Sequence, residues 1–213
     1  MFELAFIQVI SGCLIGATLA GLRRARAARR RRWMARHPAP TFVFADLVGS
    51  TALTEERGDE TAARIAREFR RTISGLSRQH GAWQVKSMGD GAMIWSPDAA
   101  RAVALAARVL EEVGVRPDLL PVRVGVHTGP VVMLGGDWYG SAVNVAARLA
   151  GEATPNEALI SWATRSAARD GFNWSLKHKC EVVLRGVERP VAVWRLKPST
   201  HDRVAALAGR GIA

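Results

Sequence analysis

Cysteine is scarce in this 213-residue sequence. Its two cysteines, Cys13 and Cys180, lie far apart and have neither the spacing of metal ligands nor that of a disulfide framework. This usage excludes a domain held together by disulfides and fits a reducing, cytosolic setting for the main domain. Apolar residues make up 48% of the chain and charged residues 23%, which excludes an intrinsically disordered protein and is typical of a globular one.

Acidic residues are also few. There are 19 of them against 30 Lys and Arg, which gives a formal net charge of +11. The excess is local, because without eight closely spaced arginines the net charge would be only +3. The basic charge is therefore a property of the short segment that carries these arginines and not of the chain as a whole. The eight are Arg23, Arg24, Arg26, Arg29, Arg30, Arg31, Arg32 and Arg36.

Directly before these arginines, Leu4 to Leu22 form 19 consecutive residues without a charge. As a helix they would extend roughly 28 Å, close to the thickness of the hydrocarbon core of a bilayer. A buried core helix would show an amphipathic stripe, whereas this segment is apolar all round. A cleaved signal peptide would carry its positive charge before the apolar run. We therefore expect a retained, single-pass transmembrane helix.

The arginine segment predicts the orientation of that helix. Positive residues next to a membrane helix stay on the cytoplasmic side, so everything after Arg23 is expected there, with the basic segment against anionic lipid. A nucleic-acid-binding arm is the alternative, but the segment directly follows the apolar run and contains one aromatic residue, Trp33. No nucleic acid is expected as a partner. Gly12, Gly16 and Ala20 recur every four residues, a spacing that lets two membrane helices approach closely.

We divide the chain into a transmembrane anchor (1–22), a basic juxtamembrane linker (23–40), a main domain (41–197) and a C-terminal tail (198–213). The main domain mixes short apolar runs with helical patterns, which predicts an α+β domain with an antiparallel-dominated sheet covered by helices. The expected strands are 41–46, 83–86, 92–95, 122–127, 131–134, 158–162, 180–184 and 191–196. The expected helices are 58–80, 97–114, 141–151 and 163–170.

Two aspartates at the ends of expected strands are candidate metal ligands. Asp46 ends the first strand, and Asp90 lies in the tight turn between the second and third. If this hairpin pairs beside the first strand, the two carboxylates converge, and such a pair suits Mg²⁺ together with a phosphate. The loop from Leu47 to Thr51 would offer backbone N–H groups to phosphate oxygens. Taken singly, an aspartate in such a position is more often an ordinary turn residue than a metal ligand.

A second candidate pair lies on the helix expected over 141–151. Asn144 and Arg148 are four residues apart, so they share one helix face and would together bind a polyphosphate. The alternative is a surface arginine and a capping asparagine. On the packing side of this helix we expect Val143, Ala146, Ala147 and Ala150.

Four separated segments resemble the catalytic domains of class III adenylyl cyclases. They are FADLVGST (44–51), KSMGDG (86–91), RVGVHTGPV (123–131) and GDWYGSAVNVAARL (136–149). The resemblance extends from about Thr41 to Leu196, and its motifs occur in the family's order. It implies a ferredoxin-like class III cyclase domain, which forms cyclic AMP and pyrophosphate from ATP with two divalent metal ions, Mg²⁺ or Mn²⁺.

The resemblance also implies roles for individual residues. Asp46 and Asp90 match the metal-binding aspartates, and Leu47 matches the position whose backbone carbonyl ligates a metal. Lys86 and Asp137 match the pair that reads adenine. A guanylyl cyclase would be expected to carry Glu and Cys at these two positions, so the sequence favours ATP over GTP.

The remaining matches concern the phosphates and the ribose. Asn144 and Arg148 match the pair that stabilises the transition state, and Gly49, Ser50 and Thr51 are expected to bind substrate phosphate. Ser50 departs from the family pattern, in which many relatives have Phe. In this family the aspartates come from one subunit and the other four residues from its partner, so a homodimer is expected to complete two sites.

Other interpretations remain open at this stage. One is a catalytically silent nucleotide-binding or scaffold module, although none of the six side chains expected to act is missing. Another is a guanylyl cyclase. A diguanylate cyclase is disfavoured because Trp138-Tyr139 replaces the expected Glu-Phe after Gly135-Gly136-Asp137. The segment between His127 and Asp137 is short, which resembles a subgroup with a reduced dimerisation arm.

Overall fold

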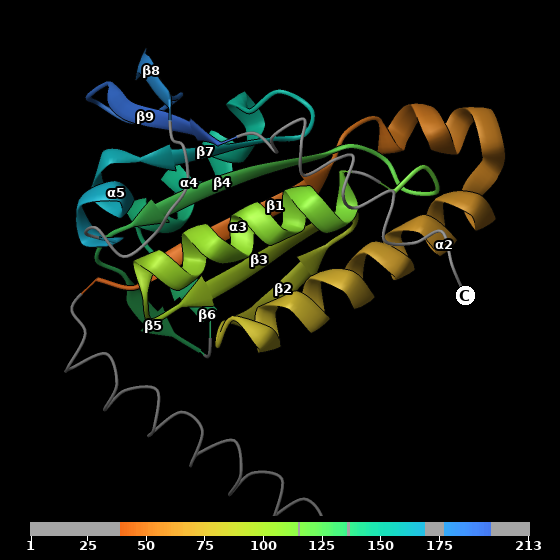
Figure 1. Ribbon diagram of the computed structural model, residues 1–213, viewed down its shortest axis with the longest axis horizontal. Helices are drawn as coiled ribbons and strands as arrows, with labels where there is room; N and C mark the ends of the chain where they lie inside the picture. The colour runs from red at the N-terminus through yellow and green to blue at the C-terminus, as the bar shows by residue number, and fades with distance from the viewer. Residues whose placement is uncertain (1–38, 115, 136, 169–176, 197–213) are drawn as a thin grey trace, which may run out of the picture. The chain divides into compact units, whose positions relative to one another are not determined.

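The computed structural model describes residues 39–114, 116–135, 137–168 and 177–196. A seven-stranded sheet forms the centre of this unit, with strand order β2-β3-β1-β4-β7-β9-β8 (Figure 1). All neighbouring strands are antiparallel except β4 and β7. The strands are β1 (Thr41–Leu47), β2 (Trp83–Met88), β3 (Gly91–Ser96), β4 (Val122–Thr128), β7 (Glu157–Ser161), β8 (Lys177–Val182) and β9 (Val191–Leu196).

The first four strands and their two helices give the predicted ferredoxin-like arrangement. The chain order β1-α2-β2-β3-α3-β4 folds into the strand order β2-β3-β1-β4. The expectation of an α+β domain with an antiparallel-dominated sheet is therefore confirmed for the described residues. The helices are α2 (Ser50–Gln79), α3 (Ala99–Val113), α4 (Ser141–Glu152) and α5 (Trp162–Ala168).

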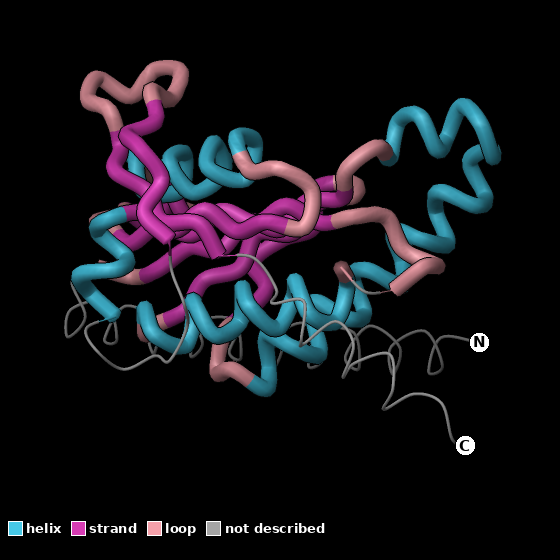
Figure 2. Tube along the Cα trace, turned by 45° about the horizontal axis from the view of Figure 1, so that its top comes forward, coloured by secondary structure: helices cyan, strands magenta, loops and turns pink. Residues whose placement is uncertain are grey.

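Helices lie on both faces of the sheet (Figures 1 and 2). Successive side chains of β1 point to opposite faces of the sheet. On one face, Val43, Ala45 and Leu47 form a core with residues of α2 and α3. A separate cluster on the other side contains Leu149 of α4 and Leu159 of β7. Both faces of the central strands are thus covered by apolar side chains.

Helix α4 packs closely on β4 because Gly125 has no side chain. A Cβ at this position would lie 2.2 Å from the carbonyl oxygen of Ala146 and 2.3 Å from the backbone nitrogen of Ala150. No side chain fits between these two backbones. The residues that α4 buries differ in part from those expected: Val143 and Ala147 are only partly buried. The helix instead buries Ala142, Val145, Ala146, Leu149 and Ala150.

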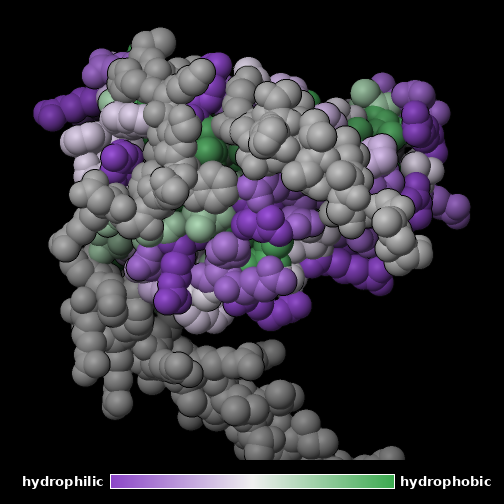
Figure 3. All heavy atoms as spheres, viewed as in Figure 1, coloured by the Kyte–Doolittle hydropathy of each residue, from purple (hydrophilic) through white to green (hydrophobic). Residues whose placement is uncertain are grey.

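Helix α2 begins earlier than expected. We predicted a loop from Leu47 to Thr51 and a helix over 58–80, but the helix begins at Ser50 and continues through a kink at Gly58. Gly58 has a φ of 78°, which glycine adopts without the penalty that a side chain imposes. The surface of α2 is largely hydrophilic (Figure 3).

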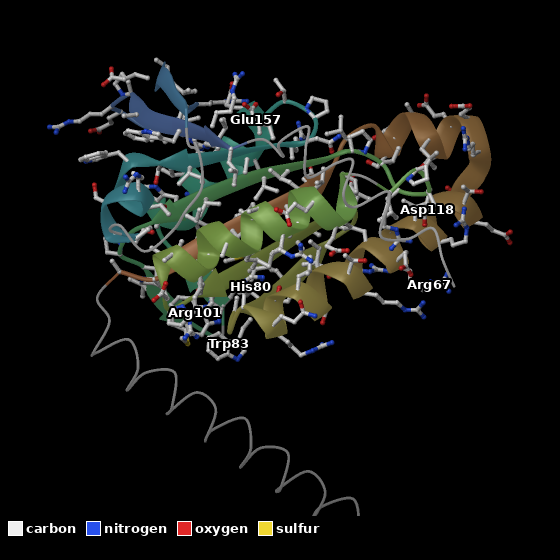
Figure 4. The ribbon with its side chains drawn as sticks, in the orientation of Figure 1. Arg67, His80, Trp83, Arg101, Asp118 and Glu157 are labelled. Atoms are coloured by element: carbon white, nitrogen blue, oxygen red, sulfur yellow. The ribbon has the colours of Figure 1, made fainter. Side chains whose placement is uncertain are left out.

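An ion pair between a buried carboxylate and a partly exposed arginine joins β7 to β9. Glu157 is fully buried (labelled in Figure 4), and its carboxylate pairs with the guanidinium of Arg195. The other carboxylate oxygen accepts hydrogen bonds from the backbone N–H and the hydroxyl of Thr154, at 2.8 and 2.7 Å. A buried carboxylate with several partners of this kind avoids the cost of an uncompensated charge.

Across the described residues, no helix has the length and apolar character needed to cross a bilayer. The predicted membrane helix, the arginine segment and the C-terminal tail lie outside those residues, so those expectations stay predictions.

Candidate active site

The pairing of β1 with β3 brings the two predicted metal ligands together. Asp46 is opposite Gly91 in the register, and the backbone N–H of Leu47 donates to the carbonyl of Asp90 at 3.4 Å. A Cβ on Gly91 would lie 3.2 Å from Oδ1 of Asp46, so this glycine leaves room for the carboxylate. The strand pairing therefore places Asp46 and Asp90 at the same end of β1 and β3, while their role as metal ligands stays a prediction.

Arg123 on β4 holds the Asp46 carboxylate from the other side. Its Nη2 and Nε donate to Oδ2 of Asp46 at 2.7 and 3.0 Å. Its Nη1 also donates to the carbonyl of Gly151 in α4, at 3.4 Å. Arg123 lies in the motif RVGVHTGPV (123–131), but the motif alone predicts no role for it. The signal that would have found it is the pairing of Asp46 with Arg123 across β1 and β4, which depends on the strand register.

The start of α2 borders the second aspartate. The hydroxyl of Ser50 donates to the carboxylate of Asp90. Gly49, with a left-handed φ of 86°, turns the chain from β1 into the helix, and no side chain caps the helix N-terminus. Ser50 and Thr51 therefore occupy the first turn, where backbone N–H groups lack partners within the helix and favour anions. Phosphate binding by Gly49, Ser50 and Thr51 stays a prediction.

Lys86 and Asp137 form an ion pair between β2 and β6 (Asp137–Tyr139). The ammonium group of Lys86 lies 2.6 Å from Oδ2 of Asp137, and Oδ1 accepts from the backbone N–H of Trp138 at 2.8 Å. Residues 137–139 were not among the expected strands, but Asp137 begins β6, which pairs with β5 (Val132–Leu134). The two predicted adenine-reading residues are thus neighbours, although they are 51 residues apart in the sequence.

An aromatic cluster fixes the strand that carries Asp137. Trp138 is almost fully buried, and its ring centroid lies 5.5 Å from that of Phe42 and 5.4 Å from that of Trp95. Trp95 in turn stacks on the half-exposed Trp83 of β2 at 4.6 Å. These contacts of large aromatic side chains anchor β6 against the same part of the sheet as Lys86.

Asn144 and Arg148 lie on α4, as the sequence predicted. Asn144 is exposed and Arg148 is partly buried. Arg148 lies against Gly186, in the turn before β9. The described structure therefore forms three groups: the Asp46–Asp90 pair with Arg123 and Ser50, the Lys86–Asp137 pair, and the two α4 side chains. Among the described residues, no hydrogen bond or ion pair links Asn144 or Arg148 to Asp46 or Asp90.

The Asp46–Asp90 pair has the ligand chemistry that a divalent cation requires, but too few ligands to surround it alone. Carboxylates and a backbone carbonyl such as that of Leu47 are the oxygen ligands that Mg²⁺ accepts. Within the part of the chain that the structure describes, no group of three or more His, Cys, Asp or Glu side chains surrounds a possible metal position. Two carboxylates suit an ion whose remaining ligands are water and substrate phosphates.

The family comparison agrees with this geometry. The model of the adenylate and guanylate cyclase catalytic domain matches residues 33–198, which is most of the chain. The chain belongs to this cyclase family. The segments that carry the Asp46–Asp90, Lys86–Asp137 and Asn144/Arg148 groups all fall inside the matched range.

Two curated adenylate cyclases are similar in sequence to this cyclase domain. A pH-sensitive adenylate cyclase of Mycobacterium tuberculosis is 34% identical over 165 residues, which cover 74% of this chain and 40% of that protein. An adenylate cyclase of Streptomyces griseus is 33% identical over 124 residues, covering 58% of this chain and 31% of that protein. The chain thus matches well under half the length of these curated relatives.

Solved structures support the same fold. The adenylyl cyclase CyaB from P. aeruginosa superposes with a TM-score of 0.68 at 25% identity, over 77% of this chain and 96% of that one. An adenylate/guanylate cyclase/hydrolase from Silicibacter pomeroyi gives a TM-score of 0.69 at 25% identity, over 76% and 97% of the two chains.

The cyclase domain has a second polar cluster at the opposite end of β1. Thr41 and Thr128 share a hydrogen bond of 2.7 Å, and Thr128 donates to Thr164 at 3.1 Å. Beside them, Nδ1 of His127 lies 2.8 Å from the hydroxyl of Ser161. Burial lowers the pKa of His127 to about 4, because the charged imidazolium would lose its hydration. His127 is therefore neutral at pH 7.

Proposed function

We propose that this protein is an adenylate cyclase that converts ATP to 3′,5′-cyclic AMP and pyrophosphate. The observation that carries the proposal is the Lys86–Asp137 ion pair, with 2.6 Å between Nζ and Oδ2. An ammonium donor and a carboxylate acceptor side by side complement the N1 acceptor and the 6-amino donor of adenine. With the base held in the same orientation, they do not complement guanine, because its N1 is a donor opposite the ammonium group and its O6 is an acceptor opposite the carboxylate.

The chemical step is an in-line displacement at the α-phosphate. The 3′-oxygen of the ribose forms a bond to phosphorus, the bond to the bridging oxygen of the β-phosphate breaks, and pyrophosphate leaves with that electron pair. The proton of the 3′-hydroxyl passes to water or to a substrate phosphate. Arg148 donates to the α-phosphate, where negative charge develops, and Asn144 orients the ribose.

Asp46, Asp90 and the backbone carbonyl of Leu47 would hold two divalent ions, Mg²⁺ or Mn²⁺. Bound there, such ions lower the pKa of an attacking hydroxyl and stabilise a leaving pyrophosphate. Arg123 and Ser50 keep the two carboxylates in place through their hydrogen bonds.

A homodimer would complete the site. Asn144 and Arg148 of one chain would face the aspartates of the other, so that two equivalent sites form around a two-fold axis. Exposed apolar side chains support a partner surface near Lys86 and Asp137: of seven large hydrophobic residues exposed in the described structure, five lie on β2, β5 and β6. The five are Trp83, Met88, Val132, Leu134 and Tyr139.

We further propose that the apolar segment from Leu4 to Leu22 anchors the protein in a membrane, with the cyclase domain on the cytoplasmic side. The support is the sequence pattern, in which the arginine segment follows the uncharged run. A membrane helix would raise the effective concentration of two cyclase domains, which favours the dimer.

The test is cyclic nucleotide production by the full chain, reconstituted with lipid, with ATP or GTP as substrate and Mn²⁺ or Mg²⁺ as metal. Cyclic AMP from ATP that is lost in Asp46→Ala supports the proposal. Cyclic GMP as the main product would assign a guanylyl cyclase. A folded, dimeric chain without either product would assign a silent scaffold module.

A further inference from the structure

Gly186 lies directly against the side chain of Arg148. A Cβ built on Gly186 would be 3.1 Å from Nη1, 3.3 Å from Nη2 and 3.6 Å from Cζ of the guanidinium. The first two distances are tighter than an ordinary van der Waals contact, the third is within the ordinary range, and all three involve the charged end of the arginine. A side chain at residue 186 would therefore require the guanidinium to shift.

The turn that contains Gly186 is fixed to the helix that carries Arg148. The backbone N–H of Val187 donates to the carbonyl of Leu184 at 3.0 Å, which closes the turn, and Gly186 has a φ of 67°. Leu184 is buried in the same apolar cluster as Leu149, the residue after Arg148. The packing of Leu184 and Leu149 in one cluster therefore fixes the position of the turn relative to the helix residue that carries the guanidinium.

One N–H group of the Arg148 guanidinium makes no hydrogen bond in the described structure. Nη1 of Arg148 is buried and has no hydrogen-bond partner among the described residues. A buried charged donor without an acceptor is unfavourable, and an anionic oxygen that reaches it would remove that cost. An arginine in this condition can donate to a phosphate oxygen at low entropic cost, because little side-chain freedom remains to be lost on binding.

We propose that Gly186 is a positioning residue for Arg148: the turn around it seats the guanidinium in the orientation in which it meets the α-phosphate. The inference rests on the proposed cyclase activity. It predicts that a side chain at position 186 displaces the guanidinium and slows the chemical step, while the adenine-reading pair and the affinity for ATP stay unchanged.

The experiment compares Gly186→Ala with the wild-type full chain. We expect kcat to fall by about tenfold or more, with KM for ATP within about twofold, since the contact matters mainly in the transition state. Gly58→Ala is the matched control: Gly58 also has a positive φ, of 78°, but nothing lies within 4 Å of its Cβ position. It introduces the same kind of backbone strain without touching a guanidinium, and its kcat should equal that of the wild type.

A double-mutant cycle separates positioning from local misfolding. In an Arg148→Ala background, where no guanidinium remains to be displaced, Gly186→Ala should cause no further loss of residual activity. An equal loss in both backgrounds would overturn the inference, because the substitution would then act through the turn alone. Wild-type kcat in Gly186→Ala would also overturn it. A wild-type chain that makes no cyclic AMP would instead contradict the proposed function.

Discussion

The ammonium group of Lys86 on β2 lies 2.6 Å from the carboxylate of Asp137 on β6, so a donor and an acceptor from two different sheets lie side by side. Both side chains are partly exposed, at 43% and 32%, which leaves them accessible to a nucleotide base. Each group satisfies the other until a base with a complementary donor and acceptor arrives, and the proposed preference for ATP depends on this exchange of partners.

Exchange of this pair should change the choice of nucleotide. In Lys86→Glu/Asp137→Cys, the residues match those expected in a guanylyl cyclase, and the ratio of activity with ATP to activity with GTP should fall by about 100-fold or more. Parallel assays of cyclic AMP and cyclic GMP measure this ratio. Arg101→Glu changes a charge on α3 and should leave the ratio as it is. An unchanged ratio in the double variant would show that the pair does not read the base.

Removal of the Asp46 charge should abolish metal binding and activity. Asp46→Asn keeps the shape of the side chain, but it weakens the metal site and leaves the guanidinium of Arg123 without its carboxylate. We expect a loss of activity of about 100-fold or more. Titration with Mn²⁺ in the presence of a non-reactive ATP analogue measures the binding itself. The control is Asp59→Asn, on the exposed surface of α2. Normal Mn²⁺ affinity in Asp46→Asn would refute the assignment of this aspartate.

His127 should make the protein less stable in acid. Its pKa is about 4 in the folded protein and near 6.5 in the unfolded chain, so between these values the unfolded state binds more protons. Stability is therefore complete above pH 6.5 and falls as the pH drops towards 4, by roughly 2–3 kcal/mol. Urea unfolding of His127→Phe across this range should show a shallower dependence on pH. The slope that remains comes from other groups, including His80, whose pKa burial also lowers. An identical slope in the variant would exclude His127 as the source.

The close contact between α4 and β4 should tolerate no side chain at position 125. Gly125→Ala places a Cβ inside the contact distance of the α4 backbone and should destabilise the protein by about 3 kcal/mol. Gly75→Ala is the opposite case: this glycine lies in α2 with nothing near its Cβ position, and alanine there should stabilise by about 0.5–1 kcal/mol. Thermal or urea unfolding distinguishes the two. Equal stability of the two variants would contradict the packing described.

The sequence predicted the parts of the fold that depend on local patterns. The β2–β3 hairpin follows from its Gly-Asp turn, and α3 follows from Asp98, whose side chain accepts from the backbone N–H of Arg101 at 2.9 Å. The start of α2 was missed because Gly58 looked like a boundary, whereas the helix continues through a kink there. Strand β6 was missed because its three residues are too few to show a period.

The candidate site was predictable to a similar degree. Motifs identified the aspartates, Lys86 and the α4 pair as separate groups. The roles of Arg123 and Gly186 depend on contacts between segments far apart in the chain, which no local pattern encodes. Strand register placed Arg123 beside Asp46, and the packing of the turn before β9 placed Gly186 beside Arg148.

Complementation between two inactive variants tests most directly whether the site is shared by two chains. Asp46→Ala lacks a metal ligand and Arg148→Ala lacks the arginine, so each homodimer has two defective sites. In a mixed dimer, one site receives both defects and the other receives none. Co-expression of the two full-length variants in equal amounts should therefore restore about a quarter of the wild-type activity. No recovery in mixtures proven to contain mixed dimers would contradict the shared site.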